Sequence, residues 1–431
     1  MPFILPILVR SRIASPHEQR KLGEDVTPSN RTAEQLGLGL SASLPDDRRV
    51  TQINWRQPPF NRWSLQRIQQ LTRTARAAHP RQASALPLAL QDISRVSFIS
   101  KDGTQRTFDD MVESTWTDGI IVVHRGQIVH EQYFNGMAED SLHMLFSCSK
   151  SVLSTLAGIL ANRGDLKLDR NVEDILPELK ATAIAGATVQ DLLDMRVGVD
   201  ITDQYEDADE QGRSWWISGG WYPPEPGYDG PSNILSFART LTASDGEHAD
   251  TYHYRSVLTD ILGLCIARVS GESVQDLFAR FVWQPLGAEH DLLTIVDAEG
   301  AATACGGFNC CLRDFGRFAW MFANGGSVDG QQVVPQSWIE ACRFPSEEIF
   351  EAFARSEYAE MFPEFAYQNK WWVRPGGHGI INAFGIHGQT MYVDPSRDFA
   401  VAKFSSQPEP VNDEHFWDQI LAFEAVANWL Q

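Results

Sequence analysis

Two pairs of segments near the ends of the chain show the alternation of apolar and polar residues that is typical of β-hairpins. Residues 119–126 are apolar and β-branched and end at a glycine, and residues 127–134 then alternate with a period of two. Residues 390–393 and 399–404 repeat this arrangement around a turn that contains Asp and Pro. Residues 415–430 then place apolar side chains on one stripe of a helix. We therefore predict strands at both ends of the body of the chain.

Between these hairpins, apolar residues recur with the spacing of helices. Four segments show this spacing, and loops rich in Gly and Pro join them: 147–163, 258–270, 273–283 and 312–324. The simplest architecture is an α+β fold, in which an antiparallel sheet (about 90–146 and 377–431) is flanked by helices and carries an inserted, mostly helical region (about 150–375). A single domain, residues 51–431, holds both parts.

Residues 1–50 differ from this body in pattern and in charge. They mix Ser, Pro, Arg and Asp without sustained periodicity, which is typical of an extension on the surface. The whole chain has a formal charge of −20, but residues 1–90 hold 13 Lys and Arg against 6 Asp and Glu. The net charge is therefore +7 up to residue 90 and −27 beyond it. We expect the basic extension to lie against the acidic body as a surface strap.

Composition and charge exclude several classes of protein. With 43% hydrophobic and 21% charged residues, the chain has the balance of a globular protein. Its acidity would repel a nucleic-acid backbone, so no nucleic-acid partner is expected. No stretch approaches the roughly 18 apolar residues that a membrane span needs, and the apolar run at the start carries its charge after it, unlike a signal peptide. We expect a cytoplasmic protein with no membrane partner.

The six cysteines argue against a disulfide scaffold. They are sparse in 431 residues, and none belongs to a Cys-x-x-Cys pair, so we expect small buried side chains rather than a zinc site. Neither a metal nor a cofactor is expected.

The clearest chemical signal is a Ser-x-x-Lys pattern, formed by Ser147 and Lys150 at the start of an apolar helix. Ser147 would lie at the positive end of the helix dipole, which favours a developing oxyanion, and Lys150 would face the same side one turn later. A lysine shielded from water loses its proton more easily, so the pair supplies a nucleophile and its base. The alternative is a serine N-cap followed by an exposed lysine. Lysine is scarce here, with 7 residues against 29 arginines, and Lys150 lies in the most apolar helix, which favours catalysis.

Other motifs follow in a recognisable order. Phe-Ser-Cys-Ser-Lys-Ser at 146–151 precedes Asn-Arg-Gly-Asp-Leu-Lys-Leu-Asp at 162–169 and Ile-Leu-Pro-Glu-Leu at 175–179, an order that resembles the class C branch of the serine β-lactamase/penicillin-binding-protein superfamily. Four further elements are similar to the 6-aminohexanoate-dimer (nylon-oligomer) hydrolases: Asp-Leu-Leu-Asp-Met at 191–195, Tyr254-Arg-Ser256, Trp371-Trp372 and Gly-Ile-His-Gly-Gln at 385–389. The likeness runs from about Trp55 to the C-terminus and implies a β-lactamase/transpeptidase-like fold.

The resemblance also implies roles for single residues. Ser147 would attack the substrate carbonyl, Lys150 would take its proton, and Tyr254 would relay protons to the leaving group. Ser256 would hydrogen-bond Lys150 or the substrate. Without the resemblance, Tyr254 would be an ordinary core or strand tyrosine; beside a cationic lysine, a lowered pKa would let its phenol act as an acid–base group. The backbone N–H groups of Ser147 and Ile386 are the expected oxyanion hole.

One element departs from the family pattern. Where the family usually carries Lys-Thr-Gly, this chain has Ala383-Phe384-Gly385. The missing lysine helps penicillin-recognising enzymes to hold the substrate carboxylate, so β-lactamase and transpeptidase activities are disfavoured. Nearby, His387 either lines the site or is a buried, hydrogen-bonded structural histidine, and the sequence does not separate these alternatives.

Several residues are expected around the substrate. Tyr205 has the spacing of a flap tyrosine that would bind the amide nitrogen, while Trp372 and Cys305 match substrate-contacting positions of the family. Trp216 belongs to an aromatic loop that either walls an apolar slot or anchors itself. Residues 203–210 hold five carboxylates, which form either a solvated loop or a negative rim that attracts a cationic substrate end.

These observations predict a serine hydrolase that cleaves a linear amide through an acyl-enzyme. A carboxylesterase of the same fold is the alternative, since fold does not determine substrate. A β-lactamase, a D-amino-acid peptidase and a catalytically silent binding protein are less favoured. The expected partners are a small-molecule amide or ester, with a cationic end if the acidic rim functions, and a second copy of the chain in a homodimer.

Overall fold

The computed structural model describes residues 30–203, 205, 208–374, 376 and 378–431. Within them, the main sheet is antiparallel and has seven strands in the order β11-β12-β13-β14-β15-β4-β5. Strand β15 pairs with both β14 and β4, so that Val401 lies opposite Tyr392 on one side and Val122 on the other. The two hairpins predicted from opposite ends of the body are confirmed, and they share this sheet. Its strands are β4 (Thr117–His124), β5 (Gln127–Tyr133), β11 (Ala366–Gln368), β12 (Trp371–Arg374), β13 (Ile380–Gly385), β14 (Gln389–Asp394) and β15 (Phe399–Ser405).

Strands β11 and β12 lie inside the range that was expected to be mostly helical. They are short and rich in aromatic residues, and their register is set by pairing with β13, as in the pair formed by Trp372 and Asn382. A strand of three or four residues carries too little periodicity to be found from local pattern alone. The sheet therefore extends further toward the middle of the chain than the sequence indicated.

Smaller sheets complete the strand set of the described residues. A four-stranded sheet has the order β1-β7-β8-β6, and its strand β6 leads directly into the helix that carries the Ser-x-x-Lys pattern. The strands are β1 (Thr74–Ala77), β6 (His143–Met144), β7 (Leu292–Ile295) and β8 (Phe308–Cys310), with two-stranded pairs formed by β2 (Ser97–Ile99) and β3 (Gln105–Thr107), and by β9 (Ser327–Val328) and β10 (Gln331–Gln332).

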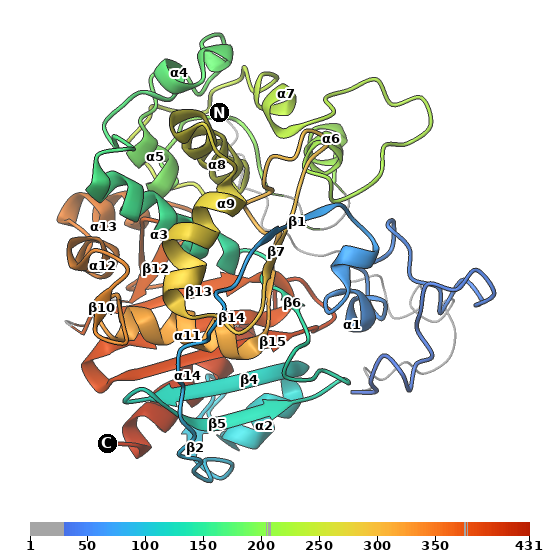
Figure 1. Cartoon of the computed structure of the whole chain (residues 1–431), viewed down its shortest axis with the longest axis vertical. Helices are drawn as coiled ribbons and strands as arrows, with labels where there is room; N and C mark the ends of the chain where they lie inside the picture. The colour runs from blue at the N-terminus through green and yellow to red at the C-terminus, as the bar shows by residue number, and fades with distance from the viewer. Residues whose placement is uncertain (1–29, 204, 206–207, 375, 377) are drawn as a thin grey trace, which may run out of the picture.

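Helices cover both faces of the main sheet. On one face, Phe108 and Phe423, from two different helices, join Ile120 and Val122 of β4 in one apolar cluster. On the other face, Phe315 stacks on Phe404 of β15 with ring centroids 5.2 Å apart. Figure 1 shows helices α4 to α8 gathered above the sheet, as expected for an inserted helical region. The helices are α1 (Asn61–Ser64), α2 (Phe108–Ser114), α3 (Cys148–Arg163), α4 (Val172–Ile175), α5 (Val189–Asp194), α6 (Glu210–Ser218), α7 (Ile234–Ala238), α8 (Val257–Ser270), α9 (Val274–Phe278), α10 (Gln284–Leu286), α11 (Leu312–Ala323), α12 (Gln336–Arg343), α13 (Glu347–Ala354) and α14 (Asp413–Trp429).

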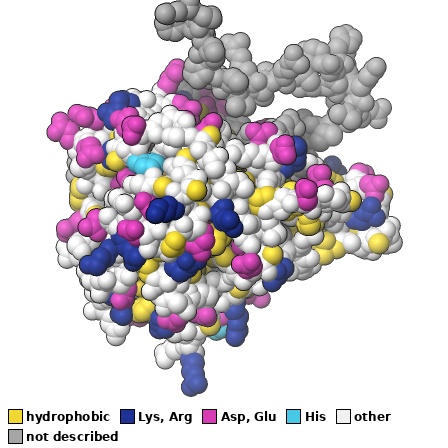
Figure 2. Space-filling model, turned by 90° about the horizontal axis from the view of Figure 1, so that it is seen from above, with side chains coloured by type: hydrophobic (Ala, Val, Ile, Leu, Met, Phe, Trp, Pro, Cys, Tyr) yellow, Lys and Arg dark blue, Asp and Glu magenta, His cyan; other side chains and the backbone are white. Residues whose placement is uncertain are grey.

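The described part of the N-terminal extension lies on the body through apolar contacts. Ala33, Leu38 and Val50 are buried, and the backbone N–H of Ala33 donates to Asn135 Oδ1 at 2.8 Å. Residues 1–29, which carry part of the basic charge, lie outside the described residues, so the ionic strap stays a prediction. On the face in Figure 2, acidic and basic side chains of the described residues are interspersed. Over the described part of the chain, no helix has the length and apolar character that a membrane span requires.

Candidate active site

The Ser-x-x-Lys pair lies at the start of α3, buried between the main sheet and the helical region. Lys150 is 1% exposed and its Nζ donates to Ser147 Oγ at 2.7 Å and to the carbonyl oxygen of Cys305 at 2.7 Å. Ser147 is the N-cap residue of α3, but its side chain makes no capping hydrogen bond. The alternative of a capping serine with an exposed lysine is therefore wrong. The hydroxyl is held by the ammonium group instead.

Tyr254 lies just before α8 and completes the set. Its phenol interacts electrostatically with Ser147 and Lys150, and Lys150 Nζ lies 4.9 Å from the centre of its ring. Trp372 stacks behind the phenol with ring centroids 5.8 Å apart. Trp372 was expected to contact substrate, but it lines neither cavity of the site described below. It instead holds the Tyr254 ring in place.

The pKa values of Lys150 and Tyr254 do not favour a lysine that has already lost its proton in the resting site. Burial lowers the pKa of Lys150, but the neighbouring Tyr254, Cys305 and Asp203 outweigh burial, and the net pKa is raised. Burial raises the pKa of Tyr254 and outweighs the lowering by Lys150 and Ser147. The expected direction for Lys150 is wrong, because neighbours from other segments outweigh burial, and the lowered pKa on which the acid–base role of Tyr254 was conditioned is not found, because burial raises it. The resting site holds an ammonium group and a neutral phenol, and the two titrate as a coupled pair.

The two expected oxyanion-hole amides are brought together by backbone that adopts uncommon conformations. Phe146, directly before Ser147, and His387, directly after Ile386, have φ of 43° and 59°. Between them, a Cβ at position 385 would lie 2.6 Å from the carbonyl oxygen of Leu145, so glycine is required where β13 approaches the start of α3. Ser147 and Ile386 consequently line the same small cavity, as an oxyanion hole requires.

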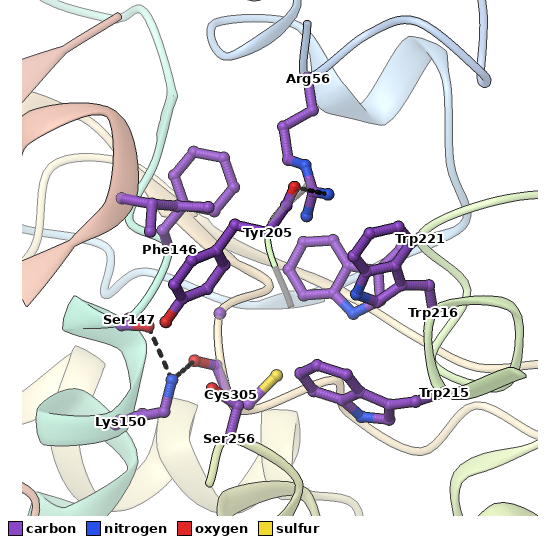
Figure 3. A pocket seen from close by; sticks show the side chains of 12 residues that line it. Arg56, Phe146, Ser147, Lys150, Tyr205, Trp215, Trp216, Trp221, Ser256 and Cys305 are labelled. Atoms are coloured by element: carbon purple, nitrogen blue, oxygen red, sulfur yellow. Dashed lines mark hydrogen bonds between the residues drawn. The ribbon is translucent and has the colours of Figure 1, made fainter. Parts of the chain in front are cut away.

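A cavity of about 40 Å³ lies above Ser147 (Figure 3). Tyr205 projects into this region with its hydroxyl toward Ser147, and its role as a flap tyrosine stays a prediction. Trp216, Cys305 and Ser256 line the cavity, together with Trp215 and Trp221 of the same aromatic segments and with three residues that the sequence did not single out: Arg56, Phe146 and Gly306. Aromatic rings thus form a large part of the wall beside the nucleophile.

Arg56, which comes from the segment before α1, fastens the Tyr205 segment. Its Nη2 donates to the carbonyl oxygen of Tyr205 at 2.7 Å, and its guanidinium lies over the Trp216 ring at 4.4 Å (Figure 3). The neighbouring Trp55 stacks on Phe146 and on Trp221, at 6.3 and 6.2 Å. The only sequence signal for the contact between Arg56 and Tyr205 was the position of Arg56 next to Trp55, which was expected to pack on the body.

The acidic loop does not act as a uniform rim. Asp203 is turned inward, where its carboxylate accepts hydrogen bonds from the backbone N–H and the hydroxyl of Ser256. Ser256 was expected to bond Lys150 or substrate, and Asp203 is its partner instead. Asp209 caps α6 by accepting from the N–H of Gly212 at 2.8 Å. Residues 204, 206 and 207 lie outside the described residues.

His387 combines both expected alternatives. It is 1% exposed and hydrogen-bonded at 2.8 Å from Nδ1 to the carbonyl oxygen of Gln407, and burial lowers its pKa to about 4. It also lines a second cavity of about 540 Å³, which adjoins the first at Arg56, Tyr205 and Trp216. Its imidazole is therefore a neutral, buried part of the wall.

The outer cavity is mainly apolar. Its walls include Ile53, Pro58, Ile217, Tyr222, Pro223, Pro224, Pro226, Pro408 and Pro410, and its charged members are Arg56, Arg213 and Glu225. Among the described residues, no three His, Cys, Asp or Glu side chains gather in a group that could hold a metal ion. All six cysteines are free and buried.

Known proteins are similar to this chain in sequence and in fold. The family model described as Beta-lactamase matches residues 104–425. The 6-aminohexanoate-dimer hydrolase of Paenarthrobacter ureafaciens is 30% identical over 364 residues, which are 84% of this chain and 89% of that protein. A solved structure from Bacillus anthracis, provisionally named 6-aminohexanoate-dimer hydrolase, is 26% identical with a TM-score of 0.81 and covers 90% of this chain and 99% of its own. A family VIII carboxylesterase shares the fold at 16% identity, with a TM-score of 0.54 over 74% of this chain and 96% of its own.

Proposed function

This chain belongs to the beta-lactamase family, and we propose that it is a serine amidase that cleaves a linear amide through an acyl-enzyme on Ser147. The observation that carries the proposal is the buried set in which Lys150 Nζ donates to Ser147 Oγ at 2.7 Å while the Tyr254 ring lies 4.9 Å from the same Nζ. A nucleophile beside a titratable pair in a cavity partly lined by aromatic side chains is suited to acyl transfer.

In acylation, Ser147 Oγ forms a bond to the substrate carbonyl carbon and the carbon–nitrogen bond breaks. The hydroxyl proton passes to the Lys150–Tyr254 pair after that pair has lost one proton, and Tyr254 delivers a proton to the leaving amine. Deacylation repeats the sequence with water as the nucleophile and Ser147 as the leaving group. The amides of Ser147 and Ile386 would stabilise the negative charge on the carbonyl oxygen in both steps.

Tyr205 supports amide rather than ester cleavage. Its hydroxyl is directed toward Ser147, where the nitrogen of a bound amide would lie (Figure 3). Burial is the main cause that raises the pKa of Tyr205, so its phenol is neutral and can hydrogen-bond that nitrogen. An ester oxygen offers no N–H for such a contact.

The outer cavity suggests the shape and charge of the remainder of the substrate. A space of about 540 Å³ lined by proline and aromatic side chains suits an alkyl chain, and Arg56 and Arg213 outnumber the single carboxylate of Glu225. We therefore favour an anionic group at the outer end. The cationic end that the acidic loop suggested has less support, since Asp203 and Asp209 bond within the protein.

A turnover panel tests this proposal. It compares a linear aminohexanoate dimer, short nitrophenyl esters, a D-amino-acid peptide and a chromogenic cephalosporin, each with wild type and with Ser147→Ala. We expect turnover of the linear amide that is lost in the variant, and weak turnover of the peptide and the cephalosporin. Turnover of esters alone would establish the carboxylesterase instead. A homodimer and a cytoplasmic location stay predictions from the sequence.

A further inference from the structure

A buried carboxylate outside the Ser147, Lys150 and Tyr254 set contacts the loop that holds Lys150. Asp260 lies in the first turn of α8 and is 0% exposed. It accepts the backbone N–H of Cys305 on Oδ1 at 2.9 Å and the indole N–H of Trp215 on Oδ2 at 3.2 Å. The carbonyl oxygen of the same Cys305 accepts the 2.7 Å hydrogen bond from Lys150 Nζ.

These contacts form a continuous path through one residue of backbone. Asp260 fixes the peptide group before the Cys305 Cα, and Lys150 binds the peptide group after it. Rotation of Cys305 would therefore move the carbonyl oxygen away from Lys150 Nζ and weaken the alignment of Nζ with Ser147 Oγ. At the other end, Trp215 is 7% exposed and lines the cavity above Ser147 (Figure 3).

We propose that Asp260 is a positioning residue for acylation: it holds the Cys305 peptide that anchors Lys150 beside Ser147, and it ties this anchor to the Trp215 wall of the substrate cavity. The inference rests on the proposed function, because it concerns the same acylation step. It assigns Asp260 no contact with substrate, so its effect is expected on the rate of acylation more than on KM.

Asp260 also acts on Lys150 through charge. Burial raises the pKa of Asp260 to about 6, against the hydrogen bonds from Cys305 and Trp215 and the charge of Lys150, all of which lower it. The carboxyl is therefore ionised above about pH 6. The other titratable groups that interact with this part of the site are Cys305, Lys370 and Asp203. A negative Asp260 favours the proton on the Lys150–Tyr254 pair.

The test uses Asp260→Asn. The asparagine keeps the shape and one acceptor oxygen for the N–H of Cys305, but it removes the negative charge and replaces the oxygen that accepts from Trp215 by an NH2 group. Asp314→Asn is the matched control, since Asp314 of α11 is also 0% exposed and accepts the backbone N–H groups of Glu289 and His290. The full chain is labelled with a fluorophosphonate from pH 6 to 10, and the acylation rate, kcat and KM on the amide, and the thermal midpoint are measured.

We expect Asp260→Asn to slow acylation roughly tenfold to 100-fold, because misplacing a catalytic group by a fraction of an ångström to 1 Å has effects of this size. The half-maximal pH should also move lower, because a negative charge beside the pair is lost. Asp314→Asn should lower the thermal midpoint without moving the pH curve. Wild-type rate and pH curve in Asp260→Asn would overturn the inference.

Trp215→Phe is the second variant, and it keeps the test decisive if Asp260→Asn does not fold. It removes the indole N–H that donates to Asp260 and leaves the hydrogen bond from Cys305, so the acylation rate should fall several-fold. KM should change as well, because Trp215 lines the cavity. A change in KM alone would overturn the inference. Absence of labelling in wild type would refute the proposed function and this inference together, whereas normal wild-type labelling with unaffected variants would refute the inference alone.

Discussion

The ammonium group of Lys150 donates a 2.7 Å hydrogen bond to the hydroxyl oxygen of Ser147, and a second one of 2.7 Å to the Cys305 carbonyl. In this arrangement the lysine holds the nucleophile but cannot accept its proton. Acylation therefore requires a form of the site with one proton fewer, shared between Lys150 and Tyr254. The pH at which this form appears is a property of the pair.

The first prediction concerns pH. Because the pKa values of both Lys150 and Tyr254 are raised, acylation should increase with pH on the alkaline side of neutrality. Asp203 raises the pKa of Lys150, so Asp203→Asn should shift the rate curve to lower pH. The rate of fluorophosphonate labelling against pH measures both. Asp209→Asn is the control, since it caps α6 on the same loop and asparagine preserves a cap; a curve that moves equally in both variants would contradict the role of Asp203.

The second prediction concerns the choice between amide and ester. Tyr205→Phe should lower amide hydrolysis roughly tenfold, the size expected for one hydrogen bond made in the transition state. Ester hydrolysis should change little, because no N–H is present. Paired kcat/KM values for an amide and an ester with the same acyl group measure the difference. Equal losses on both substrates would exclude the proposed contact.

The third prediction concerns the fastening of the Tyr205 segment. Arg56→Ala removes the hydrogen bond to the Tyr205 carbonyl and the contact with Trp216, so KM for the amide should rise several-fold and stability should fall by about 1 kcal/mol. Arg67→Ala is the matched control, because Arg67 bonds the Trp63 carbonyl at 3.1 Å and lies over that ring at 5.2 Å, outside both cavities. A similar KM change in both variants would mean that the effect is not local.

The fourth prediction concerns stability. Burial raises the pKa of Asp194 to about 6, above the value of about 3.9 for an unfolded chain. Between these values the folded state binds the proton more tightly than the unfolded state, so the Asp194 contribution to stability falls as pH rises from about 4 to 6. Relative to wild type, Asp194→Asn should therefore gain at most about 3 kcal/mol of unfolding free energy across this interval. Denaturant titrations at pH 4, 5, 6 and 7 measure the gain, and a difference that does not vary with pH would contradict it.

The longer hairpins and helices could be predicted from the periodicity of apolar residues along the chain. The hairpins around residues 126 and 396, and the helices α3, α8 and α11, each contain enough residues for a period of two or 3.6 to be visible. Strands β6 and β12 have two and four residues, and their positions depend on partners far away in the chain. Such pairings exist only in the folded protein.

The same distinction applies to the site. Ser147 and Lys150 are one helical turn apart, so their contact follows from the helix itself. By contrast, Arg56 is separated by 149 positions from Tyr205, and Asp260 by 45 from Cys305. The predicted direction of the Lys150 pKa was wrong for this reason, because it depends on charges that different segments bring together. An acidic residue in the otherwise apolar start of α8 was the available signal for Asp260.

The most direct test of the central claim is intact-mass and peptide analysis after reaction with a fluorophosphonate, for wild type, Ser147→Ala and Lys150→Ala, with the fold of each variant checked by thermal unfolding. The proposed mechanism predicts one adduct, located on Ser147 in wild type, absent from Ser147→Ala and formed roughly 10²–10⁴-fold more slowly in Lys150→Ala. A wild-type protein that forms no adduct, an adduct on another residue, or a folded Lys150→Ala that reacts at the wild-type rate would contradict it.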